Sequence, residues 1–168
     1  MDPLMIIGRQ VEEVLRIHTD LSREERRRRA LEALAAVGED RLMKLWEGLG
    51  YYNRVRNMQK AAIQMVEQYG GQFPESYEEI HALTGIGNYT AGAIGSFAFG
   101  IPKPAVDGNV LRVVSRILAS REDIMKAKVR TAIETALEEV IPKDCPGDFN
   151  QALMELGAVI CVPGGSPK

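Results

Sequence analysis

Residues 83–94 read LTGIGNYTAGAI, in which Gly85 and Gly87 flank Ile86 and a run of small residues follows. A tight turn without Cβ atoms leaves backbone N–H groups exposed where the next helix begins. Those donors, with the positive end of the helix dipole, make an anion site that suits a phosphate. A lone G-x-G is also typical of a plain connection between two helices, in which glycine supplies a positive φ. The segment therefore predicts a tight turn that could bind phosphate.

Small side chains dominate the helix expected after this turn, and they would let it pack close to a neighbour. Backbone donors carry no formal charge, so a phosphate site made of them is compatible with the net charge of −2. That charge argues against non-specific, charge-driven binding of nucleic acid, but not against a local surface of backbone donors. Phosphate contacts of this kind would position a duplex without reading its sequence.

Several polar and aromatic side chains can be explained by a structural role alone, without any function. Asp107 follows the break GIPKP, and Asp is a preferred N-cap, so by itself it predicts the start of a helix near Gly108. Trp46, Leu49 and Tyr52 are expected in the core. The arginines at 26–29 alternate with glutamates, which favours a solvated helix face.

Helical periodicity covers almost the whole chain, and no segment keeps the period-two alternation of a strand. We therefore expect an all-α protein without a sheet. Ser22 is a helix start signal, and Ser76 with Glu79 forms a capping-box pattern. Helices are expected at 10–17, 23–37, 40–47, 52–69, 77–83, 88–99, 108–120, 125–140 and 148–161.

The 168 residues are enough for one domain or two small lobes with a real core. No apolar run reaches the roughly 18 residues that span a bilayer, so no membrane partner is expected. The first ten residues lack the features of a signal peptide. Two cysteines offer no disulfide framework, which favours a reducing cytoplasm.

Four motifs in order, between about residues 40 and 167, carry a resemblance. LTGIGNYTAGAI and PAVDGNVLRVVSR resemble the helix-hairpin-helix (about 76–99) and the Gly/Pro-Asp loop of the base-excision DNA glycosylase superfamily. WEGLGYYNRVRNMQKAA and DFNQALMELGAVIC resemble its adenine DNA glycosylase branch. The resemblance implies a compact, multi-helix glycosylase domain. It also implies double-stranded DNA as partner and removal of adenine mispaired with guanine or 8-oxoguanine.

The resemblance assigns three catalytic roles. Asp107 matches the aspartate that stabilises the oxocarbenium-like sugar as the glycosidic bond breaks. Asn109 matches the residue that orients this aspartate and contacts the DNA backbone. Tyr89 stands where the sister endonuclease III-like branch carries a lysine. Lysine could form a Schiff base with the sugar and tyrosine cannot, which implies a monofunctional glycosylase.

DNA contacts are implied by the same motifs. Tyr51 matches the aromatic that wedges into the duplex beside the mismatch and offsets the unstacking of a flipped base. The remaining implied contacts are Thr84, Gly85, Ile86, Gly87 and Asn88 of the turn, with Arg54 and Arg56 as candidate phosphate contacts.

Cys161 matches the first of four cysteines that hold a [4Fe–4S] cluster in the intact family, and ligation needs all four. The chain ends near the place of the second, and Cys145 is wrongly placed to substitute. We therefore expect no cluster or other cofactor in this chain, with Cys161 as a free thiol.

The first forty residues depart from the family, so we expect an atypical helical segment at 1–40 and the glycosylase domain at 41–168, which ends before the cluster loop. Pro3 falls where the family carries the glutamate that protonates adenine and activates water. Asp2, Glu12 and Glu13 are the nearby carboxylates that could replace it. These departures suggest a fragment, as a frameshifted or recombined gene or deliberate shortening would produce, and predict compromised catalysis.

Two alternatives to a working adenine glycosylase stay open. One is a non-catalytic DNA-binding remnant that keeps the hairpin as a phosphate clamp. The other is an endonuclease III-like glycosylase, which Tyr89 and the motifs DGNV and GLGYY disfavour. A bacterial-type cytoplasm, in association with the nucleoid, is the expected location. The sequence does not indicate an oligomeric state.

Overall fold

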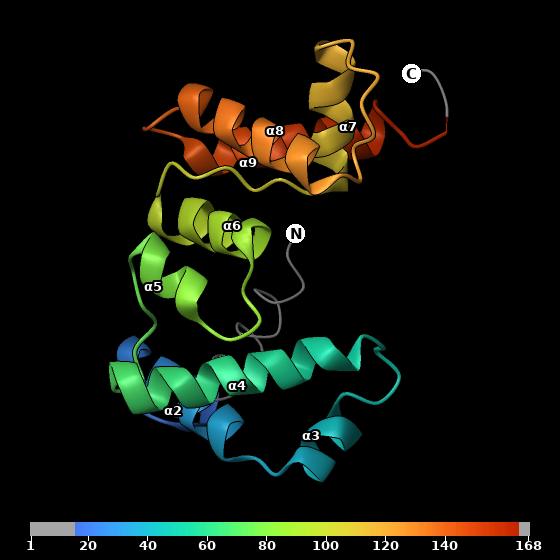
Figure 1. The fold of residues 1–168 in the computed structure, drawn as a ribbon. Helices are drawn as coiled ribbons and strands as arrows, with labels where there is room; N and C mark the ends of the chain where they lie inside the picture. The colour runs from blue at the N-terminus through green and yellow to red at the C-terminus, as the bar shows by residue number, and fades with distance from the viewer. Residues whose placement is uncertain (1–15, 165–168) are drawn as a thin grey trace. The chain divides into compact units, whose positions relative to one another are not determined.

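The computed structural model describes residues 16–164, and every regular element in that range is a helix (Figure 1). The chain forms two compact units. The first holds the described residues up to Pro74 together with Leu83–Gly85, and the second holds Glu75–Ala82 and the described chain from Ile86 onward. The expected all-α class is confirmed. The predicted domain boundary at residue 40 falls inside the first unit and stays a prediction.

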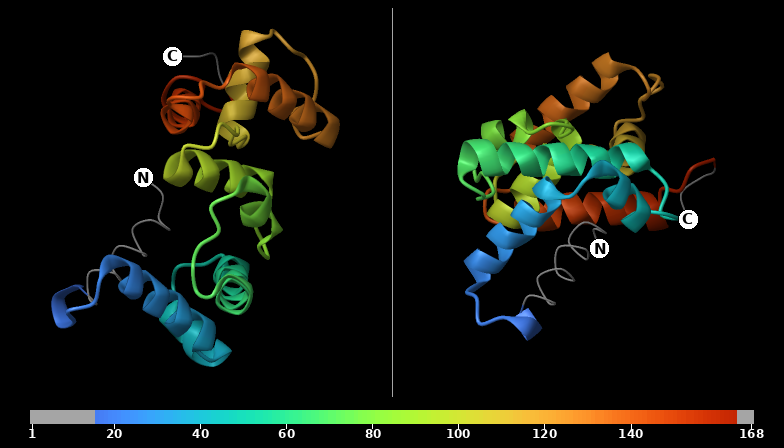
Figure 2. Two further views of the ribbon diagram at one scale, coloured as in Figure 1. Left: turned by 90° about the vertical axis from the view of Figure 1, so that its left-hand side faces the viewer. Right: turned by 90° about the horizontal axis from the view of Figure 1, so that it is seen from below.

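In the first unit, α4 (Tyr52–Tyr69) supplies the apolar face and α2 (Arg23–Ala36) lies alongside it (Figure 2). α2 buries no residue. An amide joins the two helices, because Nε2 of Gln59 donates to the carbonyl of Val37 at 2.6 Å. The α4 residues that are buried are Val55, Ala61, Ala62 and Met65. The helix start predicted at Ser22 is confirmed as a complete capping box with Glu25.

The short helix α3 (Glu39–Leu45) is followed by a loop that turns apolar side chains outward. Leu42 is buried, as the pattern predicts. The expectation that Leu49 and Tyr52 lie in the core is wrong: Leu49 is 61% exposed and Tyr52 is exposed too. Positive φ angles at Gly48 and Gly50 turn the backbone of this loop away from the path of a helix, and Leu49 between them is exposed to solvent.

The second unit contains five helices among the described residues. They are α5 (Tyr77–Ala82), α6 (Asn88–Phe99), α7 (Gly108–Ile117), α8 (Ala127–Val140) and α9 (Pro146–Val159). Its core forms where α7 meets α8 and α9. The buried members are Val106, Val110, Leu111, Val114, Ile133 and Leu137, with Phe149 and Leu153 packed against them.

The extended segment 100–107 connects α6 to α7 and is held by one buried amide. Asn150 of α9 accepts from the Ala105 amide at 3.0 Å, and its Nδ2 donates to the Ser96 hydroxyl and the Lys103 carbonyl. A Cβ on Gly92 would overlap the Pro104 carbonyl, so the small residues of α6 do permit the close packing that we expected. This segment ends at Asp107 and therefore sets where that residue lies.

The ends of several helices differ from the prediction by one to three residues. α9 begins at Pro146 because proline suits the first helical turn. α7 ends at Ile117, before Ala119 with its positive φ of 49°. The helix expected at 10–17 lies almost wholly outside the described residues. No helix between residues 16 and 164 is long and apolar enough to cross a membrane.

Candidate functional site

Asp107 is the N-cap of α7, and its carboxylate is held by three donors. One oxygen, Oδ1, accepts from the backbone amides of Asn109 at 2.8 Å and Val110 at 2.9 Å. The other, Oδ2, accepts from Nδ2 of Asn109 at 2.8 Å. Because a carboxylate offers about four lone-pair sites, one face of this half-buried group keeps the capacity to meet a positive charge.

Arg112 fixes the amide of Asn109 from the other side. Its Nη2 donates to Oδ1 of Asn109 at 2.7 Å, so that oxygen faces the guanidinium and Nδ2 must face Asp107. Nη2 also donates to the Gly157 carbonyl at 2.9 Å, and Nε donates to the Cys161 carbonyl at 3.0 Å. The guanidinium thus links the end of α9 to the carboxylate through one amide.

Sequence reasoning identified Asp107 and Asn109 but missed Arg112 and Gly157. Arg112 lies three residues after Asn109, a spacing that places both on one face of a helix. This spacing could have predicted the contact between them. Gly157 lies inside α9, where a Cβ would stand 2.5 Å from Cβ of Asn109 and 2.8 Å from its Cα. A glycine within a helical pattern is a signal of such close packing.

The two glycines of the turn differ in conformation. Gly85 has the positive φ that we expected, 82°, and a Cβ there would stand 2.5 Å from Cβ of Asn57. Gly87 does not: its φ of −97° and ψ of 179° are extended, and it is the N-cap of α6. Apart from its chain neighbours, no described residue has an atom within 4 Å of a Cβ built on Gly87, so the missing side chain leaves open space in the described part of the chain.

The N-terminus of α6 carries the features of an anion site, but the neighbouring side chains are engaged within the protein. Its N-cap, Gly87, has no side chain to cap it, and the first turn holds no acidic residue. The Thr84 amide donates to Oε1 of Gln64 at 3.0 Å. The Asn88 side chain bonds Nε2 of His81 at 2.9 Å and Oε2 of Glu134 at 3.1 Å. Ile86 is half-buried. Phosphate contact would thus fall to the backbone amides at the start of α6.

The other predicted side chains lie on two helices. Tyr89 is the second residue of α6 and is 42% exposed. Tyr51 immediately precedes α4 and is 80% exposed, with the Arg54 guanidinium 5.3 Å from its ring centroid. Arg56 has a protein partner, because its Nε donates to Oε1 of Glu39 at 2.8 Å. The structure therefore brings Tyr51 together with Arg54, and Asp107 together with Asn109.

The cysteines do not fit a [4Fe–4S] cluster. Both are free, Cys145 exposed at the start of α9 and Cys161 buried beyond its end. A helix of this length separates them by about 20 Å, so they do not converge. Partial desolvation and the Asp144 carboxylate raise the pKa of the Cys145 thiol, which disfavours the ligating thiolate. The described residues include no group of three or more His, Cys, Asp or Glu side chains that could hold a metal ion.

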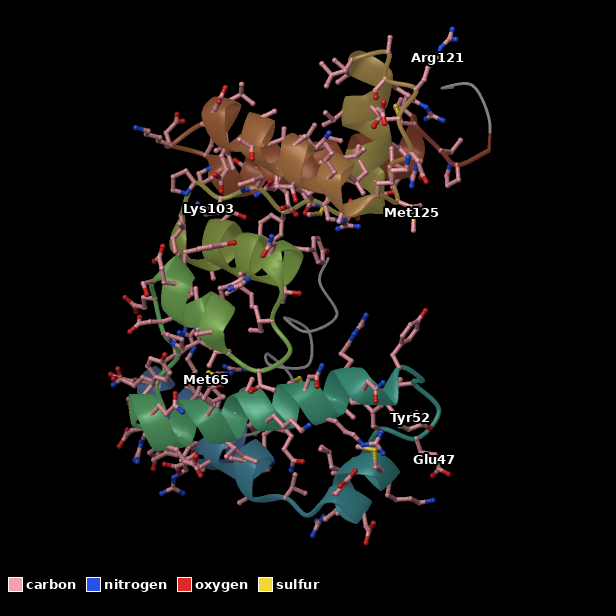
Figure 3. All side chains as sticks on the ribbon, viewed as in Figure 1. Glu47, Tyr52, Met65, Lys103, Arg121 and Met125 are labelled. Atoms are coloured by element: carbon pink, nitrogen blue, oxygen red, sulfur yellow. The ribbon has the colours of Figure 1, made fainter. Side chains whose placement is uncertain are left out.

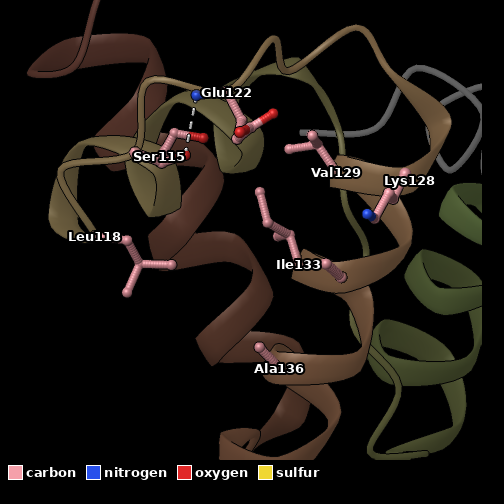
Figure 4. A pocket seen from close by; sticks show the side chains of 9 residues that line it. Ser115, Leu118, Glu122, Lys128, Val129, Ile133 and Ala136 are labelled. Carbon is pink, nitrogen blue, oxygen red and sulfur yellow. Dashed lines mark hydrogen bonds between the residues drawn. The ribbon is translucent and has the colours of Figure 1, made fainter.

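A pocket of about 390 Å³ opens between α7 and α8, at the far end of α7 from Asp107 (Figure 4). Val129, Ile133 and Leu118 line it with Ser115, whose buried hydroxyl has no hydrogen-bond partner among the described residues. Eight helical residues, roughly 12 Å, separate Ser115 from Asp107. The pocket is therefore not part of the Asp107 arrangement.

The segment with Pro3, Asp2, Glu12 and Glu13 lies outside the described residues, so the candidates to replace the missing general acid stay predictions.

Comparison with known proteins connects this geometry to one family. The model of the HhH-GPD superfamily of base excision DNA repair proteins matches residues 10–142. The human adenine DNA glycosylase is 43% identical over 134 residues, which is 79% of this chain and 24% of that protein. The adenine DNA glycosylase of Buchnera aphidicola subsp. Baizongia pistaciae is 41% identical over 129 residues, 77% of this chain and 36% of that protein. The chain thus spans about a quarter to a third of the length of these relatives.

Solved structures show the same fold. A thermostable thymine-DNA glycosylase matches with a TM-score of 0.72 and 27% identity, over 81% of this chain and 63% of that one. A trapped endonuclease III–DNA covalent intermediate matches with a TM-score of 0.68 and 28% identity, over 81% of this chain and 62% of that one. The helix-hairpin-helix glycosylase fold expected from the motifs is confirmed.

Proposed function

The chain belongs to the HhH-GPD superfamily of base excision DNA repair proteins, and on that premise we propose that it is a monofunctional adenine DNA glycosylase domain that binds double-stranded DNA. Its substrate would be adenine mispaired with guanine or 8-oxoguanine. The observation that carries the proposal is the Asp107 carboxylate, which three donors hold at the start of α7. Relatives at 41–43% identity that bear the adenine glycosylase name support the branch.

In this proposal Asp107 opposes the positive charge that develops on the sugar as the bond to adenine breaks. A preorganised carboxylate needs no reorganisation during that step, so its full field acts on the transition state. Asn109 keeps the carboxylate from rotating, and Arg112 keeps the Asn109 amide from flipping. Tyr89 has no amine, so no Schiff base forms on this chain at that position and the reaction is hydrolysis.

DNA binding is proposed for two surfaces. The N-terminus of α6, where Gly87 is an N-cap without a side chain, is suited to a backbone phosphate. The exposed Tyr51, with Arg54 against its ring, is suited to stacking on a base. These contacts depend little on formal charge, which agrees with the net charge of −2.

Proton donation to adenine is the step for which the described residues offer no assigned group. The family's glutamate position holds Pro3 in this chain, and a proline transfers no proton. This observation favours a second candidate function, a DNA-binding remnant without catalysis. We further propose that this chain alone assembles no iron–sulfur cluster, that the glycosylase domain begins near residue 41, and that the protein acts on chromosomal DNA in a bacterial-type cytoplasm.

A single-turnover assay on a duplex with adenine opposite 8-oxoguanine tests the proposal, with Asp107→Asn as the variant. Asparagine caps a helix as well as aspartate does, so the fold and duplex binding are expected to survive. Cleavage should fall by at least about 100-fold, the scale of losing one preorganised electrostatic contact. Equal cleavage by both proteins would refute the role of Asp107. No cleavage by the unmodified chain, with binding retained, would favour the remnant. Failure to bind any duplex would refute both.

A further inference from the structure

The backbone of Tyr51 is in a conformation that an aromatic residue rarely adopts. Its φ of 49° and ψ of 46° are left-handed, although its side chain is 80% exposed and gains little by burial. A bulky non-glycine residue in this region is strained. Such strain persists only where the surroundings impose it, and it concentrates at functional sites.

One side chain braces the loop before Tyr51. Nε1 of Trp46 donates to the carbonyl of Gly50 at 2.8 Å, and so closes the loop that follows α3. Gly48, with φ of 86°, and Gly50, with φ of 66°, supply the left-handed turns that a short closed loop requires. The bonded carbonyl belongs to the peptide whose nitrogen is that of Tyr51. The indole therefore restrains the peptide plane that joins Gly50 to Tyr51. Figure 3 marks this loop, which runs between the labelled Glu47 and Tyr52.

The ring of Tyr51 is also held from the side of α4. The Arg54 guanidinium lies 5.3 Å from the ring centroid, and the Arg54 amide donates to the Tyr51 carbonyl at 2.8 Å. A cation over one face of an aromatic ring leaves the other face available for stacking. Trp46 on one side and Arg54 on the other thus restrain an exposed aromatic before any ligand arrives.

We infer that Trp46 is a positioning residue that holds Tyr51 preorganised to stack on a base of a DNA duplex. This inference rests on the proposed function and assigns to Trp46 a role beyond packing. A wedge that is already oriented loses less conformational freedom when it binds, so more of the stacking energy appears as affinity. The backbone strain at Tyr51 is then the energetic cost of keeping its ring exposed to solvent.

The first test needs no DNA. Trp46→Phe keeps an aromatic ring and removes the N–H donor. A residue with φ near 50° has its amide and α protons close together, so Tyr51 should give a strong intraresidue NOE in the unmodified chain. That NOE should weaken in Trp46→Phe, because the peptide before Tyr51 is released. Leu45→Ala, which changes the exposed residue beside Trp46, is the matched control and should leave it unchanged. An undiminished NOE in Trp46→Phe overturns the brace.

The second test measures binding to a duplex with adenine opposite 8-oxoguanine and 2-aminopurine beside the adenine. Tyr51→Ala should lose about 5- to 150-fold in affinity, the range for one base–aromatic stack, and lose the rise in 2-aminopurine fluorescence. Trp46→Phe should lose part of both. In the Tyr51→Ala background, Trp46→Phe should have no further effect, because a positioning residue acts only through the residue it positions.

The outcomes separate the inference from the proposed function. Additive losses in the double variant, or full affinity in Trp46→Phe when Tyr51→Ala binds weakly, overturn the positioning role and leave the proposed function intact. If the unmodified chain binds no duplex, the proposed function fails and the stacking role fails with it. Loss of the NOE, a partial loss of affinity and non-additivity together support the inference.

Discussion

Gly157→Ala should disrupt the candidate site, because the added methyl would overlap Asn109. Its Cβ would stand 2.5 Å from Cβ of Asn109 and 2.8 Å from both Cα and the carbonyl oxygen of that residue. Two of these three atoms are backbone, so no rotamer change relieves the overlap. α9 and the first turn of α7 must separate, which stretches the hydrogen bonds from Arg112 to the Gly157 carbonyl and to Asn109.

The magnitude follows from three contributions. Overpacking costs about 1–3 kcal/mol, and weakening hydrogen bonds to a charged group costs about 1.5–3 kcal/mol. Replacing glycine by alanine inside a helix returns about 1 kcal/mol. The net loss of unfolding free energy is therefore about 1.5–5 kcal/mol, which corresponds to a fall in Tm of about 3–20 °C for a chain of this size.

Urea denaturation followed by circular dichroism measures this loss. Gly108→Ala is the matched control, because it adds the same methyl to the first turn of α7, where the nearest atom is Nη1 of Arg112 at 3.8 Å. It should change the unfolding free energy by less than about 1 kcal/mol. If Gly157→Ala is as stable as Gly108→Ala, α7 and α9 are not packed as the structure shows and the account of the Asp107 support is wrong.

Three further predictions concern single groups. Ser115→Ala removes a buried hydroxyl without a partner among the described residues and should raise the unfolding free energy by about 1 kcal/mol; a loss of stability in urea would mean that the hydroxyl is satisfied in solution. Ser22→Ala should cost about 1 kcal/mol and raise the pKa of Glu25 part of the way toward its ordinary value, because it removes the hydrogen bond of the Ser22 side chain, the largest cause that lowers this pKa, while the Ser22 amide still donates to Glu25. Since a lowered pKa stabilises the folded state only above that pKa, the native chain should lose this stabilisation on acidification and the variant should lose less of it, as an NMR titration of Glu25 with urea melts would show. Gly85→Ala should destabilise the fold, because Gly85 has a positive φ. Gly87 lies in extended backbone with open space around it, so Gly87→Ala should leave Tm unchanged and weaken duplex binding severalfold. Unchanged duplex binding by Gly87→Ala would refute phosphate binding at the start of α6.

The helices and their starts could be predicted from the sequence because they depend on local spacing. Apolar residues at helical intervals indicated α4 and α7, and Ser22 and Asp107 marked starts that the structure confirms. Asp107 could be predicted as an N-cap in the same way, whereas the role of Asn109 beside it was implied by the family resemblance. Four ordered motifs were enough to indicate the family.

Only the tertiary structure decided how that pair is supported and where the strain lies. Arg112 reaches carbonyls 45 and 49 residues away, and the closeness of Gly157 to Asn109 exists only once α9 packs on α7. The same is true of Leu49, whose apolar character predicted burial and whose loop turns it outward. Periodicity indicates which face of a helix is apolar. It does not indicate which other segment packs against that face, because this packing involves segments far apart in the chain.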